Sequence, residues 1–284
     1  MRHVTSIRVG PIGFRIGSDF AAPIAALRTL YADYPKPEIA HFTVCLPAAA
    51  PWRRLFRRSV AIEGDYTLPD AAPLPLSHGL LAAEMAMNLQ VALGHRRHLL
   101  LHASCVERGG RALLMTGESG SGKSTLATLL GANGWRFMGD EFVLIDPEHG
   151  DAHAFPRAIS LKNQAITAVE RACPTARFGP RLLGTPKGDI RHMVPPADAI
   201  ARMDEPARPA MLLFPTFGAT SDVRAVGQAE AFVRLTQAST NYTALGERGF
   251  RALTHLVQTI PARAIDYPDG DTALRLIEDL RRNL

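Results

Sequence analysis

The chain contains, from Leu113 to Leu130, the sequence LLMTGESGSGKSTLATLL. An apolar run comes first, a glycine-rich turn ending in Lys and Ser follows, and a run of helix-forming residues comes last. Gly117 and the tripeptide Gly122–Ser124 satisfy G-x-x-x-x-G-K-[ST], the Walker A pattern of a P-loop, whose backbone N–H groups surround nucleotide phosphates. A strand before and a helix after the motif are the context that such a loop needs, so this stretch predicts an α/β fold.

Each residue type in the loop has a task. Glycines allow backbone conformations that a Cβ would obstruct, and they let the peptide approach phosphate oxygens. Lys123 is expected to reach the β- and γ-phosphates of ATP, and the Ser124 hydroxyl is expected to ligate Mg²⁺. The alternative is a glycine-rich turn that matches by chance. The predicted cofactor-binding residues are Gly117, Glu118, Ser119, Gly120, Ser121, Gly122, Lys123, Ser124 and Thr125.

Composition describes an ordinary globular chain. Of 284 residues, 46% are hydrophobic and 21% are charged, which is enough for one or two cores. No run approaches the roughly 18 apolar residues of a membrane span, and no secretory signal is recognisable, so we expect a cytoplasmic protein without a membrane partner. Cys45, Cys105 and Cys173 lie far apart, without disulfide or metal-site spacing. The net charge of +5 is carried by scattered arginines, so nucleic acid is not an expected partner.

Sequence character changes near residue 75. Residues 1–75 combine short apolar runs, a helical pattern at Ala21–Tyr31 and several prolines, which predicts a small N-terminal α/β appendage. Pro69–Pro75 suits a semi-rigid linker. Residues 76–284 are predicted to form the P-loop catalytic domain. Its expected strands are Leu99–Val106, Arg111–Thr116, Trp135–Met138, Ala210–Phe214, Asp222–Val226 and Ala262–Asp266. Its expected helices are Leu80–Leu93, Ser124–Ala132, Gln164–Ala172, Ala229–Ser239, Gly249–Thr259 and Thr272–Arg282.

Two adjacent carboxylates, Asp140 and Glu141, follow the predicted strand Trp135–Met138. Open α/β sheets bind ligands at the carboxyl ends of their strands, so these acids are expected to face the nucleotide phosphates. One acid can hold Mg²⁺ while the other accepts the proton of an attacking hydroxyl. Because neighbours in an extended strand point to opposite faces, one of the two can instead have a structural role. The pattern leaves open which acid does what.

A third element precedes the loop: His102 and Ser104, in the predicted strand Leu99–Val106. The order of this histidine, the GESGSGKST loop and Gly139–Glu141 resembles the catalytic core of the HPr kinase/phosphorylase family. The resemblance is closer to the subfamily called HprK-related kinase A, on the segments LLLHASCVERGGRALL, GWRFMGDEFVLIDP, FPRAISLKN, KGDIRHMVPPADAI and NYTALGE. It implies a kinase domain of the HPr kinase/phosphoenolpyruvate carboxykinase-like type.

The resemblance implies an ATP- and Mg²⁺-dependent kinase that transfers the γ-phosphoryl group to a hydroxyl, with serine expected, of an unidentified protein or peptide. It also implies a homo-oligomer. Carried over by position, the catalytic residues are His102, Lys123, Asp140 and Glu141, and the metal ligands are Ser124, Asp140 and Glu141. Glu141 replaces the family's second aspartate, and Ala103 stands where glycine is common. The signature E-x-R-G-[LI]-G is not found, which argues against a phosphorolytic back reaction and against HPr as the substrate.

Basic residues beyond the acids are candidate substrate contacts. Arg157 and Lys162, in the segment FPRAISLK, are predicted to bind phosphate oxygens or an acidic substrate, with an ordinary solvated surface as the alternative. Because the downstream signature is missing, the alternative function is an ATP-binding regulatory module without phosphotransfer. A nucleic-acid-stimulated ATPase, a third interpretation, rests on basic charge alone.

Overall fold

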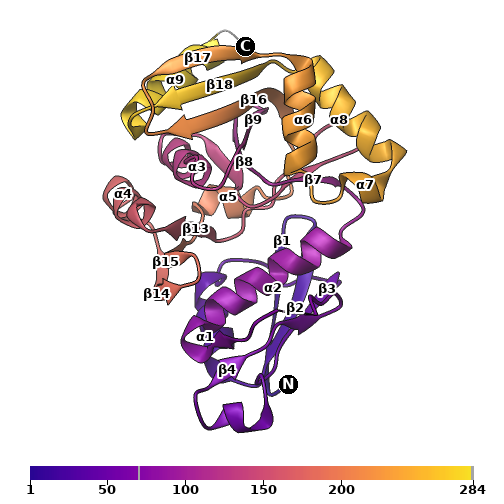
Figure 1. Ribbon diagram of the computed structural model, residues 1–284, viewed down its shortest axis with the longest axis vertical. Coiled ribbons are helices and arrows are strands. Elements are labelled where there is room, and N and C mark those ends of the chain that lie inside the picture. Colours follow the sequence, from indigo (N-terminus) through magenta and orange to yellow (C-terminus); the bar gives the residue numbers. More distant parts are fainter. Residues whose placement is uncertain (70, 283–284) are drawn as a thin grey trace. The chain divides into compact units, whose positions relative to one another are not determined.

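The computed structural model describes residues 1–69 and 71–282, and these residues form two compact units (Figure 1). Unit 1 comprises Met1–His95, Ser160–Ile166 and Arg177–Val194. Unit 2 comprises Arg96–Ile159, Thr167–Ala176 and the chain from Pro195. These units group residues by their contacts and do not test a domain boundary. The expected division into domains of residues 1–75 and 76–284 therefore stays a prediction. Residue 70, within the predicted linker, lies outside the described residues.

Unit 1 is built on a sheet with the strand order β1-β2-β3-β5. The β1–β2 and β3–β5 pairs are antiparallel, while β2 and β3 are parallel and are connected through helix α1. Apolar residues of β2 and β3, among them Phe14, Ile16 and Val44, are buried, as are Leu27 of α1 and Met87 of α2. The bounds are β1 His3–Val9, β2 Ile12–Ser18, α1 Ala21–Leu30, β3 Phe42–Leu46, η1 Pro51–Arg54, β4 Ser59–Val60, β5 Glu63–Gly64, β6 Leu74–Pro75, η2 Leu76–His78 and α2 Gly79–Gly94.

Later segments of the chain complete unit 1. Strands β13 (Ile159–Lys162), β15 (Gly188–Met193) and β14 (Phe178–Thr185) form a separate sheet in that order. Leu182 and Ile190 of this sheet share a buried cluster with Leu81 of α2. This apolar contact explains why residues distant in sequence belong to the N-terminal unit.

Unit 2 contains the large sheet, with the order β10-β8-β9-β16-β18-β17. Strands β9, β16 and β18 are parallel. Strand β8 is antiparallel to both β9 and β10, so β10 runs in the direction of β9. The carboxyl ends of β9, β10, β16 and β18 therefore meet the amino end of β8 at one edge. The bounds are β8 Ala103–Arg108, β9 Arg111–Thr116, β10 Arg136–Gly139, β16 Arg208–Phe217, β17 Asp222–Val226 and β18 Ala262–Tyr267.

Helices cover both faces of this sheet (Figure 1). Leu235 of α6 and Leu253 of α8 share a buried cluster with Leu212 and Phe214 of β16, whereas α3 and α9 contact each other and the sheet away from that cluster. The helices of unit 2 are α3 Lys123–Ala132, α5 Ala197–Ala201, α6 Gln228–Ala238, α7 Tyr242–Leu245, α8 Glu247–Thr259 and α9 Gly270–Arg282. Helix α4, Gln164–Ala172, begins in unit 1 and ends in unit 2. A small sheet contains β7 Leu99–Leu101, β11 Val143–Ile145 and β12 Ala152–His153. In the described part of the chain, every helix is too short or too polar to cross a bilayer.

The predicted strand Leu99–Val106 is wrong in one respect, because the chain changes sheets within it. β7 pairs with β11 in the small sheet, while β8 pairs with β9 and β10 in the large one. His102 lies at the break, where its backbone N–H donates to the Ala238 carbonyl at 2.8 Å and its carbonyl accepts from Thr116 Oγ1 at 3.1 Å. His102 therefore belongs to neither strand, and it lies next to the amino end of β8, at the sheet edge where the carboxyl ends of the parallel strands meet.

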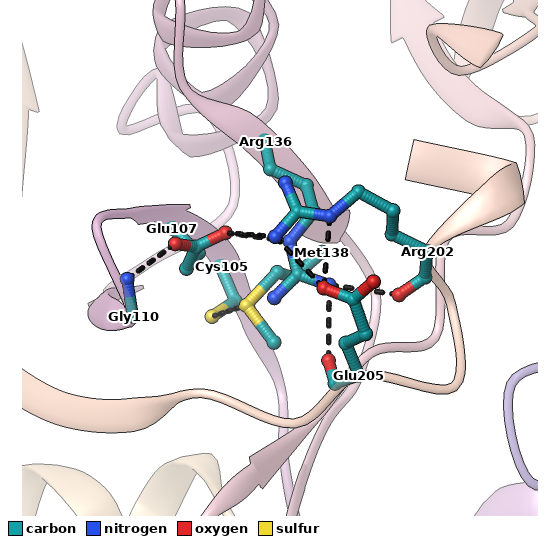
Figure 2. Close-up of polar contacts among 7 residues, drawn as sticks. All are labelled: Cys105, Glu107, Gly110, Arg136, Met138, Arg202 and Glu205. Carbon is teal, nitrogen blue, oxygen red and sulfur yellow. Dashed lines mark hydrogen bonds and ion pairs between the residues drawn. The ribbon is translucent and has the colours of Figure 1, made fainter. Parts of the chain in front are cut away.

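A buried ion pair fixes the opposite end of β10 (Figure 2). Arg136 Nε lies 2.6 Å from Glu107 Oε2 on β8, and both side chains are almost fully buried. Arg136 Nη1 donates to the carbonyl oxygens of Arg202 and Glu205 at 2.8 and 2.9 Å. Glu107 Oε1 accepts from the Gly110 N–H at 2.6 Å. These contacts hold the β8–β9 turn, β10 and the segment after α5 together.

Candidate active site

The glycine-rich loop connects β9 to α3, as the sequence predicts. Its glycines Gly117, Gly120 and Gly122 have φ values of 156°, 89° and 93°, which favour glycine. A Cβ on Gly122 would lie 2.6 Å from Tyr267 Oη, so this position also lacks space for a side chain. The loop ends at the amino terminus of α3, where the helix dipole and N–H groups favour an anion.

Lys123 is the first residue of α3 and is 7% exposed. Its Nζ donates to the carbonyl oxygens of Gly117 at 2.7 Å and Glu118 at 2.8 Å. The ammonium group therefore bends back over the loop that it follows. This places its positive charge where the loop would receive phosphate oxygens.

The remaining loop residues predicted to bind nucleotide differ in exposure. Glu118 and Ser119 are exposed, whereas Ser121, Ser124 and Thr125 are partly buried. Ser121 Oγ is buried, lacks a hydrogen-bond partner among the described residues, and lies 3.3 Å from where a Cβ on Gly117 would be. The Ser121 side chain therefore points into the loop, whereas Glu118 and Ser119 lie at its exposed surface.

Asp140 and Glu141 follow the end of β10, and their side chains contact different residues. Asp140 Oδ1 accepts a 2.6 Å hydrogen bond from Ser104 Oγ on β8, and the Ser124 hydroxyl lies close enough to lower the pKa of the Asp140 carboxyl. Glu141 Oε1 lies 3.9 Å from His102 Nε2, and both of these side chains are more than one-third exposed. The structure thus brings the acids, the histidine and the first turn of α3 to one edge of the sheet.

Asp140 has a strongly shifted pKa. Burial raises the pKa of this carboxyl to about 6, and the neighbouring charge of Glu141 acts in the same direction. The hydrogen bond from Ser104, the nearby Ser124 hydroxyl and the charge of Lys123 oppose the rise. A carboxyl with this pKa changes protonation near neutral pH, which suits a group that exchanges a proton or binds a cation.

Asp140→Asn is expected to stabilise the nucleotide-free protein at neutral pH. Because the folded-state pKa of about 6 exceeds the ordinary 3.8, the contribution of Asp140 to stability is fully present below about pH 4 and is lost as pH rises through about 6. The amide removes this loss, so the free energy of unfolding at neutral pH should rise by up to about 3 kcal/mol. Urea unfolding from about pH 4 to about pH 8 measures the effect.

Asp146→Asn is the control of opposite sign. Burial would raise the pKa of Asp146, but hydrogen bonds from the backbone N–H groups of His149 and Glu148 lower it to about 2. Its stabilisation is present above about pH 4 and is lost as pH falls through about 2, so its amide should destabilise the protein at neutral pH. If Asp140→Asn gave the same pH profile as the wild type, the account of Asp140 would be wrong.

The donors around Asp140 suit Mg²⁺, which binds hard oxygen ligands and is usually held by one or two carboxylates together with substrate phosphates. Ser124 supplies a hydroxyl and Asp140 a carboxylate, and the hydroxyl is near enough to the carboxyl to lower its pKa. No cluster of three or more His, Cys, Asp or Glu able to hold a metal occurs in residues 1–69 and 71–282. A magnesium ion held by Ser124 and Asp140 would take nucleotide phosphates as further ligands, as is usual for Mg²⁺.

Arg157 and Lys162 fall in different units. Arg157 is 5% exposed, and its backbone N–H donates to the Phe155 carbonyl at 2.8 Å. Phe155 forms a parallel bridge with Gly139, so Arg157 follows a segment that lies beside the end of β10. Lys162 ends β13 in unit 1, and its role in substrate binding stays a prediction.

Sequence reasoning missed two aromatic residues at the same edge. Phe217 ends β16, which pairs with β9, and Tyr267 ends β18, which pairs with β16; the three strands are parallel. Their signal in the sequence is an aromatic residue at the end of an apolar run. This signal could not be recognised from the sequence, because only the strand order shows that both residues lie at the same sheet edge as the glycine-rich loop.

Comparisons with known proteins find similarity to solved structures. No protein-family model matches the chain, and no curated protein matches it. The solved structure of the HPr(Ser) kinase/phosphatase from Coxiella burnetii is similar over 65% of this chain and 94% of that chain, with 15% identity and a TM-score of 0.29. With values this low, no residue role is transferred from that structure, and the functional argument depends on this chain's own geometry.

Proposed function

We propose that the chain is an ATP- and Mg²⁺-dependent kinase that transfers the γ-phosphoryl group to a hydroxyl, with serine expected, of a protein or peptide. The observation that carries the proposal is the meeting of the glycine-rich loop and the acids: the Ser124 hydroxyl and the charge of Lys123, both at the start of α3, act on the Asp140 carboxylate and oppose the rise in its pKa. A phosphate loop beside adjacent acids has the parts that phosphoryl transfer requires.

In this proposal the chain contributes mainly position and charge. Loop N–H groups and Lys123 bind the β- and γ-phosphates and stabilise the charge that spreads over the transferred group. Ser124 and Asp140 would hold Mg²⁺, which when bound neutralises phosphate charge. The substrate oxygen bonds to the γ-phosphorus, the bond from that phosphorus to the bridging oxygen breaks, and ADP leaves. A carboxylate, Asp140 or Glu141, accepts the hydroxyl proton.

The two acids can be distinguished by kinetics. Removing the carboxylate that accepts the proton should lower kcat with little change in the Kd for ATP and Mg²⁺. Removing the carboxylate that holds the metal should raise that Kd. Asp140→Asn and Glu141→Gln, measured side by side, assign the tasks. Glu141 is the more exposed acid and lies near His102, where a macromolecular hydroxyl can approach from solvent.

Phosphotransfer is tested by incubating the protein with γ-labelled ATP, Mg²⁺ and the proteins encoded beside its gene. We expect label on a serine of one partner, located by mass spectrometry of phosphopeptides and lost with Lys123→Ala. ATP binding without label in any protein, and without release of phosphate, would contradict the kinase proposal. It would instead support the ATP-binding regulatory module.

A further inference from the structure

Phe217 occupies an unusual position for a large apolar side chain. It is the last residue of β16 and is 55% exposed, although β16 lies between β9 and β18 in the large sheet. Its backbone N–H donates to the Ser121 carbonyl at 3.3 Å, and its Cβ is 3.1 Å from where a Cβ on Gly122 would be. Phe217 thus places an exposed aromatic ring in direct contact with the glycine-rich loop.

Tyr267 supports this ring from the neighbouring strand. The Phe217 and Tyr267 ring centroids are 5.9 Å apart with an interplanar angle of 59°, within the range of favourable aromatic pairs. Tyr267 is 3% exposed, and its Oη has no hydrogen-bond partner among the described residues. Since a Cβ on Gly122 would lie 2.6 Å from this Oη, the hydroxyl is directed at the loop. The Tyr267 hydroxyl therefore packs against Gly122 of the loop.

The strand order separates two sides of the loop. Asp140 and Ser104 lie on the β10–β8 side of β9, whereas Phe217 and Tyr267 lie on the β16–β18 side. If the γ-phosphate is directed at the acids, as the proposed function requires, the nucleoside must extend from the loop toward the other side. Phe217 is the exposed aromatic surface next to the loop there.

We propose that Phe217 is the stacking surface for the purine base of the nucleotide, with Tyr267 as the support beneath it. This inference rests on the proposed function and extends it, because it assigns the base a binding residue. An aromatic face that stacks on a base contributes strongly to affinity without reading hydrogen bonds. Phe217 would therefore recognise the base by the area of its stacked face, and not by hydrogen bonds to the polar groups at the edge of the base.

The test compares ATP with inorganic tripolyphosphate, which has the phosphates but no base. Isothermal titration calorimetry with Mg²⁺ gives the Kd of each for the wild type, Phe217→Ala, Phe217→Trp and Phe250→Ala. We expect Phe217→Ala to raise the Kd for ATP by roughly 5- to 100-fold and to leave that for tripolyphosphate unchanged. Phe217→Trp should retain ATP affinity. Phe250, on α8 of the same unit and 51% exposed, is the matched control and should show no change.

Each other outcome overturns the inference in a recognisable way. An ATP Kd unchanged in Phe217→Ala, with normal tripolyphosphate binding, removes the stacking role and leaves the kinase proposal standing. Equal weakening of both ligands would make Phe217 a support for the loop. Failure of the wild type to bind either ligand overturns the proposed function, and this inference with it.

Discussion

Replacing Lys123 with alanine is expected to lower phosphotransfer by on the order of 10²- to 10³-fold and to leave the protein folded. The ammonium group is the cation that the loop holds in place, through its bonds to the Gly117 and Glu118 carbonyls. In a loose transition state the charge lies on the oxygens of the transferred group, and alanine provides nothing to balance it. The two carbonyl oxygens lie in an exposed loop, so water can replace the lysine as their partner.

The measurement is the initial rate of label transfer at saturating ATP, with circular dichroism to show that the variant is folded. Lys36→Ala is the matched control, because Lys36 is exposed and lies in unit 1, so its removal should not change the rate. A Lys123→Ala protein with the wild-type rate would contradict the proposed mechanism. If Lys123→Ala does not fold, Lys123→Arg replaces it in the test. Arginine keeps the positive charge but has a different shape, so this variant should also lose activity.

Arg136→Met is expected to lower the free energy of unfolding by about 3–5 kcal/mol. The substitution leaves the buried carboxylate of Glu107 without its 2.6 Å partner, and it removes the donor to the carbonyls of Arg202 and Glu205 (Figure 2). A buried charge that loses its partner bears the full cost of desolvation. Because Arg136 begins the strand that ends before Asp140, activity should fall together with stability.

Urea unfolding of single and double variants tests this account. The double variant Arg136→Met with Glu107→Leu should recover much of the lost stability, because neither charge is then buried. Arg108→Ala is the control, since its ion pair with Glu278 at 2.7 Å is partly exposed and should contribute at most about 1 kcal/mol. A loss below about 1 kcal/mol for Arg136→Met would show that water reaches the pair, contrary to the structure.

Elements with strong local signals could be predicted from the sequence. The glycine-rich loop, with β9 before it and α3 after it, follows from the motif and its flanking residues. The β8–β9 hairpin follows from Gly109 and Gly110, whose φ values of 64° and 79° suit a two-residue turn. Helix α4 and strand β17 have the predicted bounds, because periodicity and turn residues delimit them.

Features that depend on long-range pairing could not be predicted in the same way. The break at His102 arises because β7 and β8 join different sheets, which no local pattern records. The sequence does not predict the β14–β15 hairpin, because β14 lacks a regular alternation of buried and exposed residues and contains both Gly and Pro. The ion pair between Glu107 and Arg136 requires the antiparallel register of β8 and β10. The sequence predicts the adjacent acids, but the hydrogen bond from Ser104 to Asp140 depends on the pairing of β8 with β10 and is seen only in the fold.

The central claim is that the glycine-rich loop and the acids after β10 bind one magnesium nucleotide. The most direct test is a crystal structure of the protein with Mg²⁺ and a non-hydrolysable ATP analogue. We expect the β-phosphate inside the loop from Gly117 to Ser124, Lys123 on the phosphate oxygens, and the metal between Ser124, Asp140 and the phosphates. A triphosphate bound outside the loop, or a metal that contacts neither Ser124 nor an acid at 140 or 141, would contradict the claim.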